Sequence, residues 1–383
     1  MKRFIIIVLD SLGVGALPDA AEYNSVGANT LGHIAAARQL RIPQLCQLGL
    51  ANIIPLDNVP SINAPLAAYG KMAARSAGMD TTSGHWEISG ILLEQRMPTY
   101  PHGFPPEIIK AFETAIGREV LGNCVASGTE IIQRLGPEHV RTGKPIVYTS
   151  ADSVFQLAAH EDIIPVEQLY KMCQIARSIL TGPHGVGRVI ARPFIGITRT
   201  GNRKDFSLQP PPGNLLEQVA KKGLPVISVG KIYDIFAGSH ITKAYEGHNN
   251  AQSAASVLQA LQENDHGLIF VNFVDFDMLY GHRNDLPGYA AAIEHFDEFL
   301  VQLLPALASD DILAICADHG NDPSTPGTDH NREYVPLLVY GAKVAPGNLG
   351  IRTTFADLGQ TAAAYLETEP LAAGESFLTE ILI

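Results

Sequence analysis

The sequence predicts an α/β protein with a doubly wound, largely parallel core sheet that is interrupted by an inserted α+β cap domain. Five short runs are apolar almost throughout, which is typical of strands that helices cover on both faces. Helix-like stretches separate several of these runs, so the order is strand, helix, strand. A middle region follows a different pattern and has borders rich in Pro and Gly.

Each element of the core rests on its own pattern. The predicted strands are Phe4–Leu9, Leu224–Val229, Leu268–Val274, Ile312–Ala317 and Val335–Tyr340. The predicted helices are Leu215–Lys222, Ala251–Gln262 and Tyr289–Leu304. Gly223 suits the position after a helix C-terminus. The last helix carries apolar residues three and four positions apart, which places them on one helical face.

The left edge of the middle region is the segment MPTYPHGFPPE, and its right edge is the Pro-rich segment 209–213. Composition breaks place the core domain at 1–95 and 211–383 and the inserted domain at 96–210. Inside the insert we expect helices at Glu107–Ile116 and Val166–Leu180 and strands at Pro145–Thr149 and Arg188–Ile195. An insertion between two parts of one sheet predicts a discontinuous core domain that carries a cap.

Composition excludes several classes of protein. The 383 residues are 46% hydrophobic and 17% charged, which indicates a large core rather than disorder. Net charge is −12, so we expect no sequence-independent binding to nucleic acid. No apolar run is long enough to span a membrane. Four scattered cysteines without a CxxC pair favour reduced thiols and a cytoplasmic protein.

Carboxylates follow three of the predicted strands. Asp10 ends the first apolar run, Asp277 follows the LIFVNFV run, and Asp318 ends ILAICAD. Ligands of an open parallel sheet bind beyond the carboxyl ends of its strands, so these acids are expected to meet at one edge. Charges of one sign at that distance repel unless cations neutralise them.

Three histidines lie near these acids in sequence. They are His282, His319 and His330. Together with the three carboxylates they supply about three protein groups to each of two metal ions, with open positions left for substrate. Mixed oxygen and nitrogen ligation suits Mn²⁺ or Zn²⁺, and the chemistry does not choose between them. Taken singly, each Asp is more often a cap or turn residue and each His a structural one.

The segment Gly78–Glu87 contains Thr81, Thr82 and Ser83 in a row and the single Trp. A hydroxyl held by divalent ions loses its proton more readily and becomes a nucleophile toward phosphorus. The competing interpretation is that Asp80 and the hydroxyl residues only cap a helix that starts near His85. Both interpretations are compatible, because a helix N-terminus also presents N–H groups to a phosphoryl group.

One basic segment stands out in this acidic chain. It contains Arg188, Arg192, Arg199, Arg203 and Lys204. Guanidinium groups bind phosphate through two parallel N–H bonds, so the segment is a candidate phosphate-binding region of the cap. The alternative is a solvated charged face, which we favour for the last two residues. Lys231 follows a predicted strand and is a further candidate for the same anion.

The chain resembles the bacterial phosphopentomutases of the alkaline phosphatase superfamily. The motif ADHG is shared with the whole superfamily, whereas GHWE within DTTSGHWE, the GTDH loop and YTSADSVFQLAAHE are specific to the mutases. The segments VLDSLGVGALPDA, VNFVDFDMLYGHRND and VGRVIARPF match as well, so the resemblance runs from Phe4 to Phe377. It implies an alkaline-phosphatase-like core with a cap.

The resemblance also implies an activity and its residues. The activity is interconversion of ribose or deoxyribose 1-phosphate and 5-phosphate with two Mn²⁺ and a priming sugar bisphosphate, either glucose 1,6-bisphosphate or ribose 1,5-bisphosphate. One ion matches Asp10, Asp318 and His319, and the other matches Asp277, His282 and His330. Thr81 matches the phosphorylated residue. Substrate recognition matches Asp152, Arg188, Ile190, Arg199 and Lys231.

The chain departs from the family pattern at two positions near the nucleophile. Met79 stands where the family commonly has Lys, and Ser83 replaces a frequent Thr. Neither change removes a ligand, although loss of a cation at Met79 weakens the expected attraction for phosphate.

Two other functions use the same residues. A metal-dependent phosphatase or phosphodiesterase would pass the phosphoryl group to water, and a non-catalytic metal-binding protein would not need Thr81. The basic cap favours the mutase, because a phosphoenzyme must be shielded from water. We therefore predict a mutase that acts on a small sugar phosphate; the oligomeric state stays open.

Overall fold

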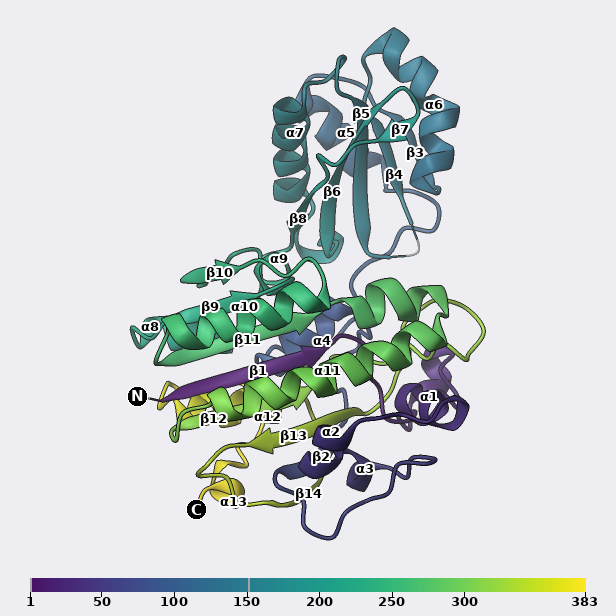
Figure 1. Ribbon diagram of the computed structural model, residues 1–383. Helices are drawn as coiled ribbons and strands as arrows, with labels where there is room; N and C mark the ends of the chain where they lie inside the picture. The colour runs from purple at the N-terminus through teal and green to yellow at the C-terminus, as the bar shows by residue number, and fades with distance from the viewer. Residues whose placement is uncertain (1, 151) are drawn as a thin grey trace. The chain divides into compact units, whose positions relative to one another are not determined.

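The computed structural model describes residues 2–150 and 152–383 (Figure 1). Packing divides the chain into two units. The core unit comprises the chain up to Gln95 and the segment Pro210–Ile383, and the inserted unit is Arg96–Gln209. The boundaries expected from composition, 95/96 and 210/211, differ from these by at most one residue. The two units are described separately below.

The core unit contains an eight-stranded mixed sheet in the order β10-β9-β11-β1-β12-β13-β2-β14. Its strands are β1 (Arg3–Leu9), β2 (Ala68–Met72), β9 (Val226–Val229), β10 (Lys243–Tyr245), β11 (Gly267–Phe273), β12 (Asp311–Cys316), β13 (Val335–Tyr340) and β14 (Gly347–Arg352). Every residue of β1, β11 and β12 is buried, as the uninterrupted apolar runs predict.

One strand of this sheet runs against the others. β10, β9, β11, β1 and β12 are parallel, whereas β13 is antiparallel to both β12 and β2. The expectation of a parallel strand at Val335–Tyr340 is therefore wrong. A parallel pair needs a crossover to bring the chain back to the starting edge, but the chain after β12 forms a loop at the same edge and returns directly.

Helices cover the core sheet in two groups, as the fold class predicts (Figure 1). One group packs α10 and α11 together, with α1 and α2 against α11; the other packs α12 against α4 and α8, with α9 against α4. Their bounds are α1 (Thr30–Ala37), α2 (Pro43–Leu48), α3 (Leu50–Ile53), α4 (Thr81–Ile88), α8 (Leu215–Lys221), α9 (Ile232–Ile235), α10 (Asn250–Glu263), α11 (Leu286–Ala306), α12 (Ala356–Tyr365) and α13 (Leu378–Ile381).

Charged groups inside this core are paired or hydrogen-bonded. Arg3, at the start of the central strand, is 5% exposed and binds the carboxylate of Asp311 with N–O distances of 2.5 and 2.8 Å. Such a pair offsets the large cost of moving two charges out of water.

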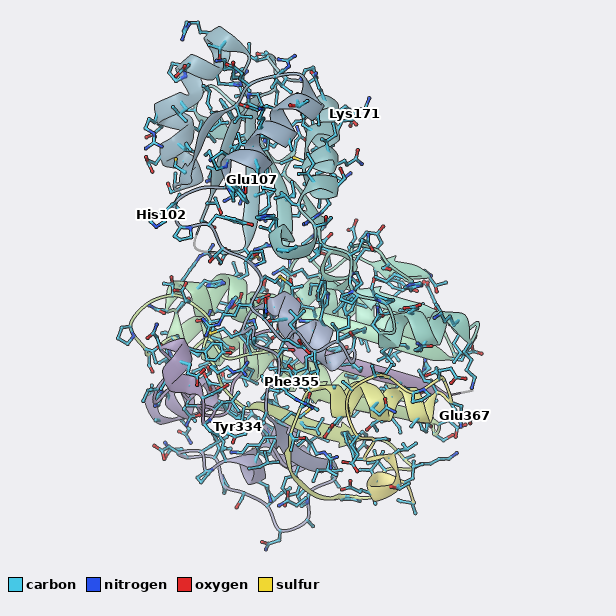
Figure 2. The ribbon with its side chains drawn as sticks, turned by 180° about the vertical axis from the view of Figure 1, so that it is seen from behind. His102, Glu107, Lys171, Tyr334, Phe355 and Glu367 are labelled. Atoms are coloured by element: carbon cyan, nitrogen blue, oxygen red, sulfur yellow. The ribbon has the colours of Figure 1, made fainter. Side chains whose placement is uncertain are left out.

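The region around α12 shows the usual division between core and surface. Phe355 is fully buried before α12, whereas Glu367 lies at the surface (Figure 2).

The inserted unit is an α+β domain, as its sequence predicts. Its strands are β3 (Leu121–Val125), β4 (Ile146–Thr149), β5 (Val154–His160), β6 (Arg188–Ile195), β7 (Thr198–Arg199) and β8 (Lys204–Ser207). They form a sheet in the order β3-β4-β5-β6-β7, with β8 also paired to β6. Its α-helices are α5 (Pro106–Ile116), α6 (Gly128–Thr142) and α7 (Val166–Ile179).

The helices of the inserted unit bury one face and expose the other. On α5, Ile108 and Phe112 enter a core with Leu169 of α7, while Glu107 and Lys171 of the same two helices are exposed (Figure 2). α6 packs against β3, β4 and β5 and closes a second small core around Phe194 and Tyr148. The inserted sequence therefore builds its own hydrophobic core.

The topology of the core unit brings four chain segments to one sheet edge. β11, β1 and β12 are adjacent and parallel, so the residues that follow them meet there. β2 ends beside the start of β13, since Met72 pairs with Val335. The segment toward α4 and the loop between β12 and β13 consequently reach the same edge.

Within residues 2–150 and 152–383, none of the helices has the length and apolarity needed to cross a bilayer.

Candidate two-metal active site

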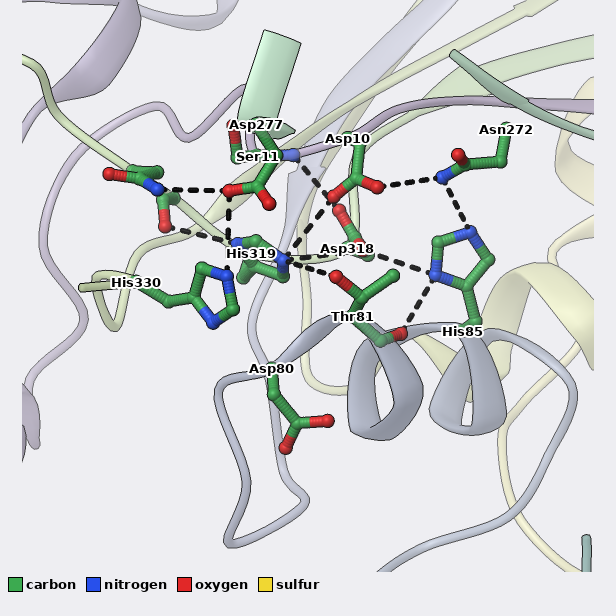
Figure 3. Close-up of polar contacts among 12 residues, drawn as sticks. Asp10, Ser11, Asp80, Thr81, His85, Asn272, Asp277, Asp318, His319 and His330 are labelled. Carbon is green, nitrogen blue, oxygen red and sulfur yellow. Dashed lines mark hydrogen bonds and ion pairs between the residues drawn. The ribbon is translucent and has the colours of Figure 1, made fainter. Parts of the chain in front are cut away.

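The site lies where these segments meet, and its first donor group comes from two segments that are far apart in sequence (Figure 3). Asp10 follows β1, and Asp318 and His319 follow β12; all three are at most 2% exposed. The Nε2 atom of His319 lies 3.4 Å from Asp10 Oδ1 and 3.4 Å from Asp318 Oδ2. Three candidate ligand atoms thus surround one point in a buried place.

Thr81 points its hydroxyl at this group. Its Oγ1 lies 3.3 Å from His319 Nε2. Thr81 is the first residue of α4, and Asp80 caps the helix by accepting hydrogen bonds from the N–H groups of Thr82 and Ser83. The helix therefore starts four residues earlier than the predicted start near His85. The capping interpretation and the nucleophile interpretation are compatible, because the cap fixes the residue that carries the hydroxyl.

A second donor group lies beside the first. Asp277 Oδ1 lies 3.4 Å from His330 Nε2, and its Oδ2 lies 3.0 Å from His282 Nε2. Asp277 does not follow its strand directly but sits in a π-helical turn, Phe276–Tyr280, after β11. Atoms of Asp277, His319 and His330 also lie together as a possible ligand set. His282 is the most exposed donor, with 40% of its side chain accessible.

The donor atoms fit divalent cations. Tetrahedral ligands at about 2.1 Å from an ion lie about 3.4 Å from each other, which is the spacing observed between His319 Nε2 and the two carboxylates. Among the residues that the structure describes, none forms a hydrogen bond with the buried atoms Asp10 Oδ1, Asp318 Oδ2 and His330 Nε2. Buried polar atoms normally have a hydrogen-bond partner, so three such atoms without one, all within the two donor groups, indicate metal ligands.

The pKa shifts of Asp318 and His319 also indicate that positive charge stabilises this group of carboxylates. Burial raises the pKa of Asp318, but the neighbouring His319 and His85 outweigh it and bring that pKa below its usual range. Burial lowers the pKa of His319, but Asp318, Asp10 and Asp277 outweigh it and raise that pKa to about 10. Without metal, a protonated imidazole therefore supplies the positive charge that these carboxylates require.

Residues around the donors set their orientation, and the sequence did not point to these residues. Ser11 donates its N–H to Asp318 Oδ1 from a left-handed conformation with φ of 77°. Asn272 donates to Asp10 Oδ2, and Asn321 donates to Asp277 Oδ1. A polar Asn272 inside the apolar run LIFVNFV is the one signal that could have singled it out.

The predicted substrate residues of the inserted unit are spread along β6: Asp152, Arg188 and Ile190 lie at or beside its start, whereas Arg199 pairs with Phe194 near its end. Arg188 and Ile190 project from β6, and Arg188 lies 3.5 Å from Asp205 of β8. Arg199 is exposed on β7, and Asp152 is exposed before β5. In the core unit, Lys231 is half-buried directly before α9.

Comparisons with known proteins follow this geometry. The model of the metalloenzyme superfamily matches residues 2–370. A phosphopentomutase of Desulfitobacterium hafniense is 58% identical over the full length of both chains. A phosphopentomutase of Caldanaerobacter subterraneus is 56% identical and covers all of this chain and 98% of its own. The chain belongs to the phosphopentomutase family.

Membership makes this chain an isomerase and a metalloenzyme of the alkaline phosphatase superfamily. The fold agrees with that assignment. A Pyrococcus horikoshii protein of known structure superimposes with a TM-score of 0.52 at 16% identity, covering 97% of this chain and 99% of its own. The predicted family and fold class are thereby confirmed.

Proposed function

We propose that the protein interconverts the 1-phosphate and 5-phosphate of ribose or deoxyribose through a phosphorylated Thr81. The 51–58% identical relatives are named phosphopentomutases, and Thr81 is the hydroxyl residue placed within 3.3 Å of the donor groups. That position of Thr81 is the observation that carries the proposal. Thr82, its neighbour on α4, has no such contact among the described residues.

The reaction needs two transfers of one phosphoryl group. In the first, a free sugar hydroxyl attacks phosphorus, the bond from phosphorus to Thr81 Oγ1 breaks, and the hydroxyl proton ends on that oxygen. The product is a sugar 1,5-bisphosphate. In the second, Thr81 Oγ1 attacks the other phosphate, whose bond to the sugar breaks and leaves a hydroxyl there. Phosphorus and protons balance, and a sugar bisphosphate is needed to prime the bare enzyme.

The two donor groups would hold two divalent ions, which we propose to be Mn²⁺. Asp10, Asp318 and His319 would hold one, and Asp277, His282 and His330 the other. The ions would supply positive charge to the equatorial oxygens and to the attacking hydroxyl. His319 belongs to the donor set nearest Thr81, so its imidazole also limits where the threonine hydroxyl can lie.

Recognition of the sugar phosphate is proposed for Asp152, Arg188, Ile190, Arg199 and Lys231. Arginines suit a phosphate because two parallel N–H groups meet two of its oxygens, and an aspartate accepts from sugar hydroxyls. The four free cysteines support a cytoplasmic location, where thiols stay reduced.

The test supplies ribose 5-phosphate, Mn²⁺ and a trace of sugar bisphosphate and follows both products. We expect ribose 1-phosphate to form without release of free phosphate. Thr81→Ala should abolish turnover, while Thr82→Ala, one position along the same helix, should keep measurable activity. Release of free phosphate without ribose 1-phosphate would identify a phosphatase instead and would refute the mutase proposal.

A further inference from the structure

A buried chain of hydrogen bonds connects the nucleophile helix to a metal-ligand candidate (Figure 3). His85 Nδ1 lies 2.8 Å from the carbonyl oxygen of Thr81, and its Nε2 lies 3.3 Å from Asn272 Nδ2. Asn272 Nδ2 lies in turn 3.0 Å from Asp10 Oδ2. Both linking residues are 0% exposed, so water does not compete for these bonds.

The chemistry of the two ends fixes every proton in this chain. A carboxylate and a carbonyl only accept hydrogen bonds, so Asn272 must donate to Asp10 and His85 Nδ1 must donate to Thr81. The second hydrogen of the Asn272 amide then points at His85 Nε2, which accepts it. The proton of His85 therefore resides on Nδ1, the nitrogen that faces the Thr81 carbonyl oxygen.

The same two residues also contact the carboxylates of Asp10 and Asp318, which are candidate metal ligands. Asn272 binds Asp10 Oδ2, whereas Oδ1 of the same carboxylate lies 3.4 Å from His319 Nε2 in the donor group and has no hydrogen-bond partner among the described residues. His85 Nδ1 also lies 3.1 Å from Asp318 Oδ2, the oxygen of the second carboxylate that likewise has no hydrogen-bond partner among these residues. One imidazole thus contacts both the backbone of the nucleophile and a metal-ligand candidate.

We propose that His85 and Asn272 are positioning residues that hold Thr81 in register with Asp10 and Asp318. This inference rests on the proposed role of Thr81. Neither residue belongs to the ligand sets or to the proposed substrate-binding residues, so they act through the residues they hold. Groups that orient ligands typically change metal affinity or activity by about 10–100-fold when removed.

The inserted unit contains a matched control. His139 is also 0% exposed; its Nδ1 lies 2.7 Å from the carbonyl oxygen of Lys144, and its Nε2 accepts from the N–H of His160 at 2.8 Å. It makes the same two kinds of bond as His85, but it belongs to a different unit with its own core. His139→Gln therefore repeats the chemical change without touching the donor groups.

The experiment measures Mn²⁺ affinity of metal-stripped protein by calorimetry, together with kcat, KM and the melting temperature. His85→Gln removes the Nδ1 donor, and Asn272→Leu removes the donor to Asp10. We expect each to lower Mn²⁺ affinity and kcat by about 10–100-fold, with KM for sugar phosphate little changed. His85→Asn retains an N–H near the Nδ1 position and should recover part of the loss.

His139→Gln should keep the wild-type affinity for Mn²⁺ even where its melting temperature falls. Wild-type affinity and kcat in both His85→Gln and Asn272→Leu would overturn the proposal, as would an equal loss of affinity in His139→Gln. Should His85→Gln fail to fold, Asn272→Leu decides, because it leaves the bond between His85 and Thr81 in place. Failure of wild-type protein to form ribose 1-phosphate would reject the proposed function alone, since the Mn²⁺ affinities still test the placement of the ligands.

Discussion

Glu333 is a buried acid whose removal should stabilise the protein at neutral and alkaline pH. It is 1% exposed; Oε1 accepts from the hydroxyl of Thr30 at 2.6 Å, and Oε2 accepts from the N–H groups of Thr30 and Gly15 at 2.9 and 3.0 Å. Burial raises the pKa of Glu333 to about 7, with a smaller contribution from Asp322 in the same direction, although its hydrogen bonds oppose the rise.

The direction and size of the effect follow from this pKa. Below pH 4.5 the acid is protonated in both the folded and the unfolded chain. As pH rises from there to about 7, the unfolded chain loses the proton first, so folding becomes less favourable, and above about 7 the loss levels off. The interval between these two values corresponds to about 3 kcal/mol of unfolding free energy.

Glu333→Gln should abolish this pH dependence. A glutamine reproduces the protonated acid, because its oxygen can accept from the two N–H groups while its amide donates to the Thr30 hydroxyl. Melting temperatures of metal-free wild type and variant are compared at pH 5 and pH 8 in chelator. Part of the loss has already occurred at pH 5, so the variant should gain about 5 °C on wild type between the two pH values, at about 2 °C per kcal/mol for a protein of this size. Equal differences at both pH values would refute the reasoning.

Three further variants test the supports of the site. The Glu87 carboxylate accepts hydrogen bonds from the N–H groups of Arg75 and Ser76. Glu87→Gln replaces one of its two acceptor oxygens by an NH₂ group, which cannot accept, so the free energy of unfolding in urea should fall by about 1–3 kcal/mol. Gly84→Ala would place its Cβ 2.3 Å from the carbonyl oxygen of Asp318, so calorimetry should show weaker Mn²⁺ binding. Arg188→Ala should raise KM for sugar phosphate yet leave two metals bound in elemental analysis; metal loss would mark the arginine as structural.

Much of the core could be predicted from the sequence because its strands are buried on both faces. β1, β11 and β12 appear as uninterrupted apolar runs, and all of their residues are buried. β2 and β14 did not stand out. The residues of β2 alternate between buried and half-buried, and β14 is largely exposed, so neither strand contains an apolar run. The antiparallel direction of β13 depends on the loop before it rather than on its own residues.

The candidate ligands could be predicted because acids at strand ends and nearby histidines form a local pattern. The residues that hold these ligands in place could not be predicted from the sequence. Asn272 lies 262 residues from Asp10 in sequence, and His85 lies 187 from Asn272, so no local pattern connects them. The start of α4 was misplaced because Thr81, Thr82 and Ser83 have weak helix preference, whereas the capping box at Asp80 fixes the first turn.

The central claim is that the hydroxyl of Thr81 carries the phosphoryl group. Mass spectrometry of peptides from protein incubated with sugar bisphosphate and Mn²⁺ tests it most directly. The account predicts one added phosphoryl group, on the peptide that contains Thr81, and none on Thr81→Ala protein treated alike. An active enzyme that becomes labelled only on another residue, or that turns over without any label, would contradict it.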